Sequence, residues 1–199
     1  MRRAIHHLKT ADPVMAGLIE RVGNGRMAIR PPTFETLARA IVFQQLNWKA
    51  ATKIYERLVE AAGGEVTPDS ILKLTPQRMR KCGLSRQKLS YIRDLAQKTR
   101  SGEVEFASLP SQSDEEVIAH LTRVKGIGVW SAQMFLMFAL KRRDVLPTTD
   151  YGILSAVRKA YGIKKLPKAR TVTRLAEKWR PYRSVACWYL WRSLDVKPN

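Results

Sequence analysis

A single carboxylate stands between helical patterns in the segment LPTTDYGI, residues 146–153, where Asp150 follows a proline and two threonines. The chain around it is strongly basic, with 36 Lys and Arg against 17 Asp and Glu and a formal net charge of +19. A positioned carboxylate can stabilise a developing positive charge and can orient or deprotonate a water molecule. Asp150 could equally be the N-cap of the next helix, a role that would also suit Thr148 or Thr149. The segment therefore predicts a catalytic carboxylate or a helix cap.

Residues 121–140, LTRVKGIGVWSAQMFLMFAL, have the pattern of two helices joined by a Gly-x-Gly turn. Gly126 and Gly128 can adopt backbone conformations closed to other residues, and they leave no side chain in the way of a ligand. Successive N–H groups at the start of the second helix can then approach a phosphate. Glycines also end helices for purely structural reasons, but the two flanking helices, the net charge and the neighbouring Lys125 favour phosphate binding.

The positive charge is spread over the whole chain and favours a polyanionic partner. Lys and Arg side chains release counterions when they meet nucleic acid, so nucleic acid is the leading candidate. A merely soluble basic surface and attraction to anionic lipid are the alternatives, but no single amphipathic helix concentrates the cations. Residues 1–10 are too polar for a signal peptide, and the longest apolar run, residues 134–140, is too short to span a bilayer. We expect a soluble intracellular protein.

Cysteines and histidines do not indicate a metal site. Cys82 and Cys187 lie far apart and without CxxC pairing, so we expect two buried thiols and no disulfide framework, zinc site or four-cysteine iron–sulfur site. The histidines also lack the spacing of metal ligands; they are His6, His7 and His120. No metal and no redox or organic cofactor is therefore expected.

Helical spacing and helix caps recur, whereas alternating strand patterns are scarce, so we predict an all-α fold of about nine or ten helices. One helix should start after Thr33 as its N-cap and run to about residue 43. Its predicted buried face consists of Phe34, Leu37, Ala38 and Ile41. A second helix should run from about Trp48 to Gly63, because glycines suit a left-handed C-cap. The polar segment QQLN, residues 44–47, joins the two helices.

Further helices are predicted downstream. Two Thr-Pro pairs, at residues 67–68 and 75–76, each combine a cap with the residue best suited to a first helical turn. The segment 83–100 should form a longer helix with its basic residues outward and Leu89, Ile92 and Leu95 or Ala96 inward. Ser113 and Glu116 have capping-box spacing.

Taken in order, these segments resemble the helix–hairpin–helix DNA glycosylases, in which a Gly-rich hairpin is followed by a catalytic aspartate at the spacing seen here between Gly128 and Asp150. VKGIGVWSA resembles the hairpin, with Lys125 where proline is more usual. FETLARAIVFQQLNWKAATKI resembles the first core helix pair, and GLSRQKLSYIRDLA resembles the next block. EKWRPYRSVACWYLWR resembles the closing helix of the 3-methyladenine, or alkylpurine, branch. The resemblance covers roughly residues 12–195.

The resemblance implies an all-α, two-lobed helix–hairpin–helix fold with the active-site cleft between the lobes. We expect residues 1–199 to form a single compact glycosylase domain. Residues from about 30 to 115 would make one lobe. An N-terminal helix and residues from about 116 to 199, with the hairpin at 121–140, would make the other.

The resemblance also implies a base excision repair enzyme that removes alkylated purines from duplex DNA by hydrolysing the N-glycosidic bond. Such an enzyme extrudes the nucleotide from the stack and stabilises an oxocarbenium-like sugar as the base departs. Asp150 would stabilise that sugar and direct water to it. Strand-cleaving relatives carry a lysine, which forms a Schiff base with the sugar, two positions after the second hairpin glycine. This chain has Trp130 there, which implies a monofunctional glycosylase without lyase activity.

The other site residues follow from the same comparison. A cationic alkylated purine would be held by the faces of aromatic rings. The base pocket is assigned to Trp130, Trp191, Phe43 and Met134. Trp130 could instead be core, and at least one member of the set Trp188, Tyr189 and Trp191 should be. The DNA-binding hairpin is assigned to Lys125, Gly126, Ile127, Gly128, Val129 and Trp130. Asp144, the competing carboxylate, is expected to be solvated or ion-paired.

The polar junction between the first two core helices is a third candidate site. Apolar or amide side chains in a loop can fill the space left by an extruded nucleotide, and Gln45 or Leu46 is placed to act as this wedge. A satisfied helix–helix turn is the alternative. The resemblance also suggests a monovalent cation at the hairpin carbonyls. We expect a monomer that binds double-stranded DNA with a damaged base; a non-catalytic helix–hairpin–helix protein that binds damaged or bent DNA is the alternative.

Overall fold

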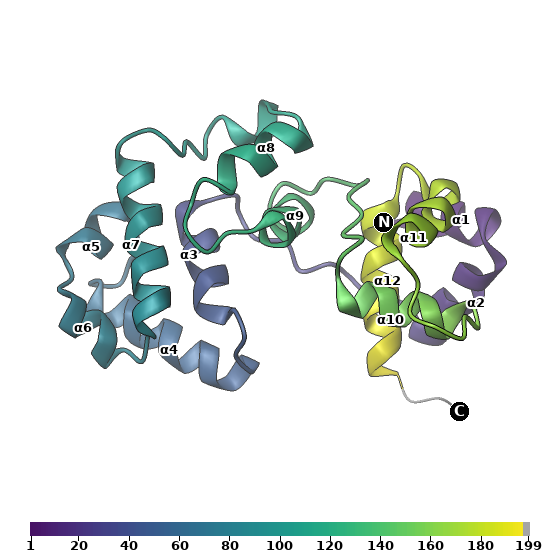
Figure 1. Ribbon diagram of the computed structural model, residues 1–199, viewed down its shortest axis with the longest axis horizontal. Helices are drawn as coiled ribbons and strands as arrows, with labels where there is room; N and C mark the ends of the chain where they lie inside the picture. Colours follow the sequence, from purple (N-terminus) through teal and green to yellow (C-terminus); the bar gives the residue numbers. More distant parts are fainter. Residues whose placement is uncertain (197–199) are drawn as a thin grey trace. The chain divides into compact units, whose positions relative to one another are not determined.

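The computed structural model describes residues 1–196, and all of the regular secondary structure in that range is helical (Figure 1). It contains twelve α-helices and two 3₁₀ helices there, and no β-strand. The all-α prediction is confirmed, but the expected nine or ten helices were too few. The N-terminal segment forms two helices instead of one, because Asp12 ends α1 (Arg2–Ala11) and caps α2 (Pro13–Val22), which begins with a proline.

The chain forms two compact units, and each is described by itself. The terminal unit consists of residues 1–29 and the chain from residue 141 onward, and the middle unit, named for its place in the sequence, is residues 30–140. Residues 116–140 lie in the middle unit, which differs from the lobe boundary that we expected. The physical reason is local packing, because Asp94 binds the hairpin backbone at Lys125 and the backbone N–H of Arg30 donates to the carbonyl of Phe138.

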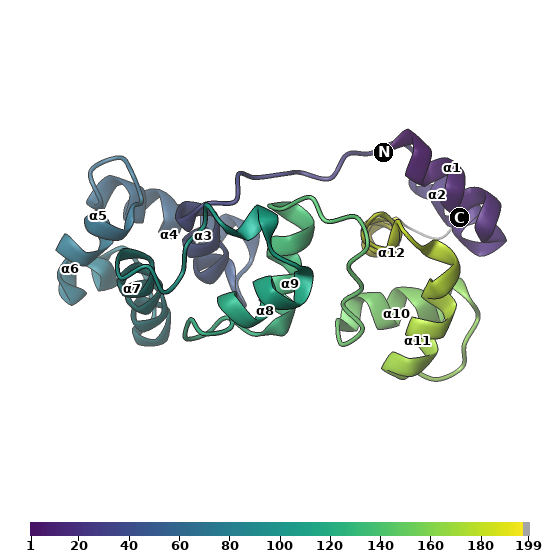
Figure 2. The same ribbon diagram turned by 90° about the horizontal axis from the view of Figure 1, so that it is seen from above.

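The middle unit is built around two adjacent helices, α3 (Phe34–Phe43) and α7 (Arg86–Arg100) (Figures 1 and 2). The remaining helices of the unit are α4 (Trp48–Ala61), α5 (Pro68–Lys73), α6 (Pro76–Lys81), a 3₁₀ helix (Leu109–Ser111), α8 (Asp114–Leu121) and α9 (Val129–Phe138). α7 also packs against α5 and α6, and α8 packs against α9. The core of α3 consists of Phe34, Leu37, Ala38, Ile41 and Val42, which includes every residue of its predicted face.

The helix starts of the middle unit follow the predicted capping chemistry. The Thr33 hydroxyl accepts from the backbone N–H of Thr36 at the start of α3, and Thr67 and Thr75 cap α5 and α6. Ser113 and Glu116 form both bonds of the capping box at the start of α8. α4 ends just before two glycines with positive φ, as expected of a left-handed helix stop.

The terminal unit consists of α1, α2, α10 (Tyr151–Ala160), α11 (Ala169–Ala176), a 3₁₀ helix (Glu177–Trp179) and α12 (Arg183–Asp195). α12 packs against α10 and α2. It buries Cys187 and Tyr189 completely, and Cys82 in the middle unit is buried too, so both cysteines are buried thiols as predicted. No helix within residues 1–196 is both long enough and apolar enough to cross a membrane.

A buried carboxylate ties together distant parts of the terminal unit. Asp12 is 0% exposed, and one of its oxygens, Oδ2, accepts from the Tyr161 hydroxyl, from the Trp179 indole N–H at 2.8 Å and from the Lys178 ammonium at 3.1 Å. The other oxygen caps α2 by accepting from the backbone N–H groups of Val14 and Met15. A buried charge is stable only when its hydrogen-bonding capacity is filled in this way.

Candidate functional site

Asp150 is the N-cap of α10, and the same carboxylate oxygen serves a second helix. Its Oδ1 accepts from the backbone N–H of Ile153 at 2.7 Å and from the indole N–H of Trp191, on α12, at 2.8 Å. The structure therefore confirms the capping role and adds a direct link to Trp191. An ionised carboxylate only accepts hydrogen bonds, so two N–H donors suit its charged form.

Gly152 makes this pairing possible by leaving room for the indole. A Cβ atom at Gly152 would lie 3.0 Å from Asp150 Oδ1 and 3.0 Å from Trp191 Cδ1, closer than ordinary van der Waals contact. Glycine in the first turn of a helix costs roughly 1 kcal/mol relative to alanine, so it indicates a packing or functional need. The glycine in DYGI was the available sequence signal for this close approach, and sequence reasoning missed it.

Asp144, the competing carboxylate, is ion-paired as expected. Its oxygens accept from the Arg180 guanidinium at 2.7 Å and from the Arg183 guanidinium at 2.8 and 3.0 Å. Both arginines hold the start of α12 against the segment that leads to α10. Asp144 thus has a structural role within the terminal unit.

The hairpin turn between α8 and α9 uses its two glycines differently. Gly126 has φ of 78°, and a Cβ atom there would lie 2.0 Å from the ring of Tyr91, on α7. It is therefore glycine for two reasons, backbone conformation and close packing. Gly128 is the N-cap of α9 with φ of −93°, which any residue can adopt, so of the two glycines only Gly126 uses a backbone conformation closed to other residues. No atom lies within 4 Å of a Cβ built at Gly128, so the absent side chain leaves the start of α9 open to a ligand.

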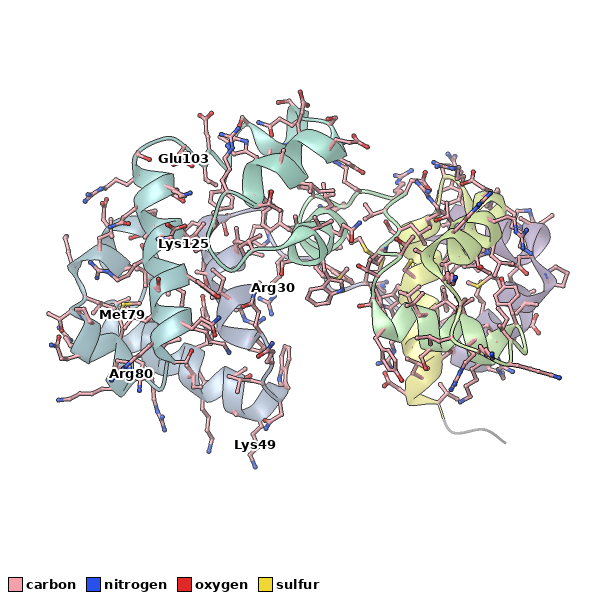
Figure 3. The ribbon with its side chains drawn as sticks, viewed as in Figure 1. Arg30, Lys49, Met79, Arg80, Glu103 and Lys125 are labelled. Atoms are coloured by element: carbon pink, nitrogen blue, oxygen red, sulfur yellow. The ribbon has the colours of Figure 1, made fainter. Side chains whose placement is uncertain are left out.

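One face of α7 supports both turns of the middle unit, and we call its four residues the α7 face. They recur at spacings of three or four residues and so lie in a row along the helix; they are Lys88, Tyr91, Asp94 and Lys98. Tyr91 packs under Gly126, and Asp94 accepts from the backbone N–H of Lys125 at 2.8 Å. Figure 3 shows Lys125 beside α7.

The two lysines of the α7 face bind backbone carbonyls at helix ends. The Lys88 ammonium donates to the carbonyls of Val42 and Gln44 at 2.7 and 2.6 Å, at the end of α3. The Lys98 ammonium donates to the carbonyl of Arg123 at 2.5 Å, just after α8. We expected the basic residues of this helix to face outward, which was wrong for these two. The terminal carbonyls of a helix need donors and favour a cation, and long lysine stems can reach them along apolar surface. Burial lowers the pKa of Lys88.

The α3–α4 turn, residues 44–47, holds both wedge candidates on the surface. Gln45 has φ of 54°, a left-handed conformation rare for a residue other than glycine, and Leu46 is 41% exposed. The Asn47 side chain caps α4 by accepting from the N–H of Ala50. The Gln44 amide donates to the carbonyl of Gly126 at 3.0 Å. The α3–α4 turn and the hairpin are therefore joined directly.

The structure places the base-pocket candidates in both units. Trp191 contacts Asp150 in the terminal unit. Trp130 and Met134 are one turn apart on α9, and Phe43 ends α3, so these three belong to the middle unit. Trp130 is 45% exposed, so it is not a core residue, whereas Tyr189 is the fully buried aromatic of α12. The pocket roles, and the cleft between the units, remain predictions.

Several residues that shape these sites carried no clear sequence signal. The α7 face was hidden because its lysines have the pattern of a solvated surface. Asp12 was hidden because its partners lie far away in the sequence.

Among residues 1–196, no three His, Cys, Asp or Glu side chains are grouped so that they could hold a metal ion.

A family model and a curated relative both match most of this chain and point to one family. Residues 38–181 match the family model described as HhH-GPD superfamily base excision DNA repair protein. The chain is 34% identical to DNA-3-methyladenine glycosylase 1 of Schizosaccharomyces pombe over 97% of this chain and 87% of that protein.

Solved structures agree with the family match. A 3-methyladenine DNA glycosylase of Schizosaccharomyces pombe, in complex with abasic DNA, superposes with a TM-score of 0.84 at 34% identity over 96% of this chain and 95% of that one. A DNA-3-methyladenine glycosidase of Bacillus halodurans superposes with a TM-score of 0.86 at 34% identity, over 96% and 88% of the two chains. The helix–hairpin–helix resemblance is thus confirmed, and the chain belongs to the HhH-GPD superfamily of base excision DNA repair proteins.

Proposed function

We propose that the protein is a DNA glycosylase that excises alkylated purines from duplex DNA by hydrolysing the N-glycosidic bond. Relatives at 34% identity are named 3-methyladenine glycosylases, and one of them was solved with abasic DNA. The observation that carries the proposal is the fixed carboxylate of Asp150, which accepts from both the Ile153 N–H and the Trp191 indole. The protein would act on DNA inside the cell.

Asp150 would act on the sugar as the base leaves. Extruding a nucleotide costs a few kcal/mol, and bond cleavage then develops positive charge on the sugar ring. A carboxylate whose position is already fixed stabilises that charge without reorganising during the reaction. The same group can orient a water molecule or accept its proton as the water attacks the sugar. Trp191 fixes the carboxylate through its N–H and offers an aromatic face for a cationic base, a contact worth about 0.5–2 kcal/mol.

The proposal includes the absence of strand cleavage. A lyase reaction needs an amine that forms a Schiff base with the sugar, and this chain has Trp130 where strand-cleaving relatives carry lysine. Water is then the nucleophile. Borohydride treatment of the protein mixed with abasic DNA should trap no covalent adduct, and a trapped adduct would contradict this part of the proposal.

The hairpin and the α3–α4 turn would bind the DNA. Lys125 and the N–H groups at the start of α9 would contact phosphate, and Gln45 or Leu46 would fill the space of the extruded nucleotide. Backbone carbonyls are suitable ligands for a monovalent cation, and those of residues 121–128 would hold one. Two carbonyls nearby already accept from side chains, Arg123 from Lys98 and Gly126 from Gln44. A bound cation would add attraction to phosphate and no chemistry.

Replacing the carboxylate tests the mechanism. Asp150→Asn should retain binding to abasic duplex DNA while the single-turnover rate of base release from alkylated DNA falls by roughly 10² or more, since a positioned acid–base group is lost. Asp69→Asn, which removes an exposed carboxylate from α5, is the matched control and should excise normally. Chromatography of the released bases would also identify the preferred lesion.

Two outcomes would overturn the proposal. Unchanged excision by Asp150→Asn would remove the carboxylate from the mechanism. A native protein that binds abasic DNA but releases no base would indicate a non-catalytic binder of damaged DNA.

A further inference from the structure

An arginine and three aromatic rings form a cluster on the surface of the middle unit, and we call it the Arg39 cluster: Arg39, Phe43, Trp48 and Tyr55. The guanidinium carbon of Arg39 lies 3.8 Å from the centroid of the Phe43 ring, 5.0 Å from that of Trp48 and 5.7 Å from that of Tyr55. The rings of Phe43 and Trp48 meet edge to face, with centroids 5.0 Å apart. The Trp48 indole is thus held in place by two neighbours.

Trp48 is nevertheless largely open to solvent. It is 65% exposed, the most of any tryptophan in the described chain, although the Arg39 cluster fixes its orientation. An exposed apolar side chain is ordinary by itself, but a rigidly held aromatic ring pays little entropy when it binds a flat partner. The rest of the Arg39 cluster is less exposed and supports the ring from the protein side.

The position of Trp48 relates it to the DNA-binding turns. It is the first residue of α4 and follows the wedge candidates Gln45 and Leu46 by two or three positions. The same turn is hydrogen-bonded to the hairpin through Gln44 and Gly126. Trp48 therefore lies at the turn from which the wedge would enter the duplex.

The surroundings carry the charge that DNA requires. Burial lowers the pKa of the Arg39 guanidinium, and the nearby positive charge of Arg30 lowers it further. Lys49 and Lys53 are exposed on the first turns of α4, and Figure 3 shows Lys49 extending from the start of that helix. Positive charge beside an exposed aromatic ring is a common combination in proteins that bind unstacked bases.

We propose that Trp48 is a stacking platform for the orphaned nucleobase, the base that loses its partner when the damaged nucleotide is extruded. The inference rests on the proposed function, because only an extruding protein creates such a base. Every base has a π-face, so the platform accepts any of the four bases and carries no hydrogen-bond code. Base–aromatic stacking strengthens binding by about 5- to 100-fold per base.

Binding to two duplexes tests the proposal. One duplex carries a stable abasic-site analogue opposite 2-aminopurine, whose fluorescence falls when it stacks, and the other is fully paired and undamaged. Trp48→Ala should weaken binding to the first duplex by about 5- to 100-fold and leave the 2-aminopurine brighter in the complex. Binding to the paired duplex should change less than about threefold, because that duplex offers no unpaired base.

Three controls separate stacking from other effects. Trp48→Phe keeps an aromatic face and should retain most of the affinity. Leu166→Ala removes an exposed apolar side chain from the terminal unit and should change nothing. Because Trp48→Ala removes no charge, the slope of log K against log salt should match that of the native protein. Thermal unfolding of Trp48→Ala, compared with the native protein, checks that the fold is intact.

Several results would overturn the platform. Unchanged affinity for the orphaned-base duplex would do so, as would an equal loss on both duplexes, which would indicate a general contact with the duplex. A change in oligomeric state without a change in DNA affinity would show that Trp48 binds another copy of the chain.

Failure of this inference can be told apart from failure of the proposed function. Normal excision with no effect of Trp48→Ala on binding contradicts only the platform. A native protein that releases no base, but prefers the orphaned-base duplex through Trp48, contradicts only the glycosylase assignment.

Discussion

At Asp150, capping and catalysis do not compete for the side chain. Both N–H donors, from Ile153 and Trp191, bind the same oxygen. Rotation of the carboxylate would break both bonds, and hydrogen bonds to a charged group contribute about 1.5–3 kcal/mol each. The helix start therefore holds the group in the orientation that the proposed reaction uses, which is electrostatic preorganisation by ordinary secondary structure.

Gly152→Ala should damage excision without unfolding the protein. The new Cβ would lie 3.0 Å from both Asp150 and Trp191, so one of them must shift by a few tenths of an ångström. We expect a loss of roughly 10-fold in single-turnover base release, because small misplacements of catalytic groups are costly. Thermal stability should change little, since alanine adds up to about 1 kcal/mol of helix propensity that offsets the crowding.

The matched control for that substitution is Gly17→Ala, in α2. A Cβ there meets nothing within 4 Å, so this variant should be slightly more stable and fully active. Normal excision by Gly152→Ala would show that the contact between Trp191 and Asp150 does not matter for activity.

Among the helices, α7 supports both DNA-binding turns of the middle unit, although its sequence pattern gave no sign of this role. Lys88 binds the end of α3, while Tyr91, Asp94 and Lys98 bind the hairpin. Two turns that lie far apart in the chain thus share one rigid support. A displacement of α7 would therefore displace both the α3–α4 turn and the hairpin.

Lys88→Met should weaken binding to orphaned-base DNA by about fivefold to a hundredfold, since the two α3 carbonyls lose donors worth roughly 0.5–1.5 kcal/mol each. Methionine keeps the length and the apolar stem of lysine. Lys73→Met, exposed at the end of α5, removes the same charge from the surface and should alter only the nonspecific, salt-dependent part of binding. Fluorescence titrations on damaged and paired duplexes measure both effects, and equal behaviour of the two variants would contradict a positioning role for Lys88.

Local chemistry determined how far the helices could be predicted. Caps such as Thr33 and Ser113 act within four residues, so the sequence displays both partners of each bond. The α7 face depends on carbonyls of other segments, which a sequence pattern does not reveal. The Asp150 segment stood out as a lone carboxylate in a basic chain, and the resemblance supplied its catalytic role. Its partner Trp191 and the close approach of that indole over Gly152 required coordinates.

On the scale of the whole molecule, the two units are stabilised by different kinds of interaction. The middle unit is organised around apolar α3 and the α7 face, whereas the terminal unit has the buried Asp12 at a junction of segments distant in sequence. Burial would raise the pKa of Asp12, but hydrogen bonds from Trp179, Tyr161 and Lys178 outweigh burial and lower the pKa below its usual value. Its folded-state charge therefore contributes stability above the unfolded pKa of about 3.9.

Asp12→Asn should destabilise the protein by about 3 kcal/mol near neutral pH, because the donors around it lose their charged acceptor. The native protein loses this contribution as the pH falls below about 4 and through the lowered folded-state pKa. The stability gap between native protein and variant should therefore narrow in acid. Urea unfolding between about pH 3 and 7 measures it, and a gap that stays constant with pH would contradict the charged role of Asp12.

The shared support of the two turns also limits how this protein can be recombined with its relatives. A chimera that imports only a foreign hairpin would place new side chains over Tyr91 and new carbonyls beside Lys98, while Lys88 still held the original α3–α4 turn. The smallest transplantable module is therefore discontinuous: residues 42–48, 86–100 and 121–130 must travel together. Laboratory evolution of the two DNA-binding turns would likewise have to vary these three segments together.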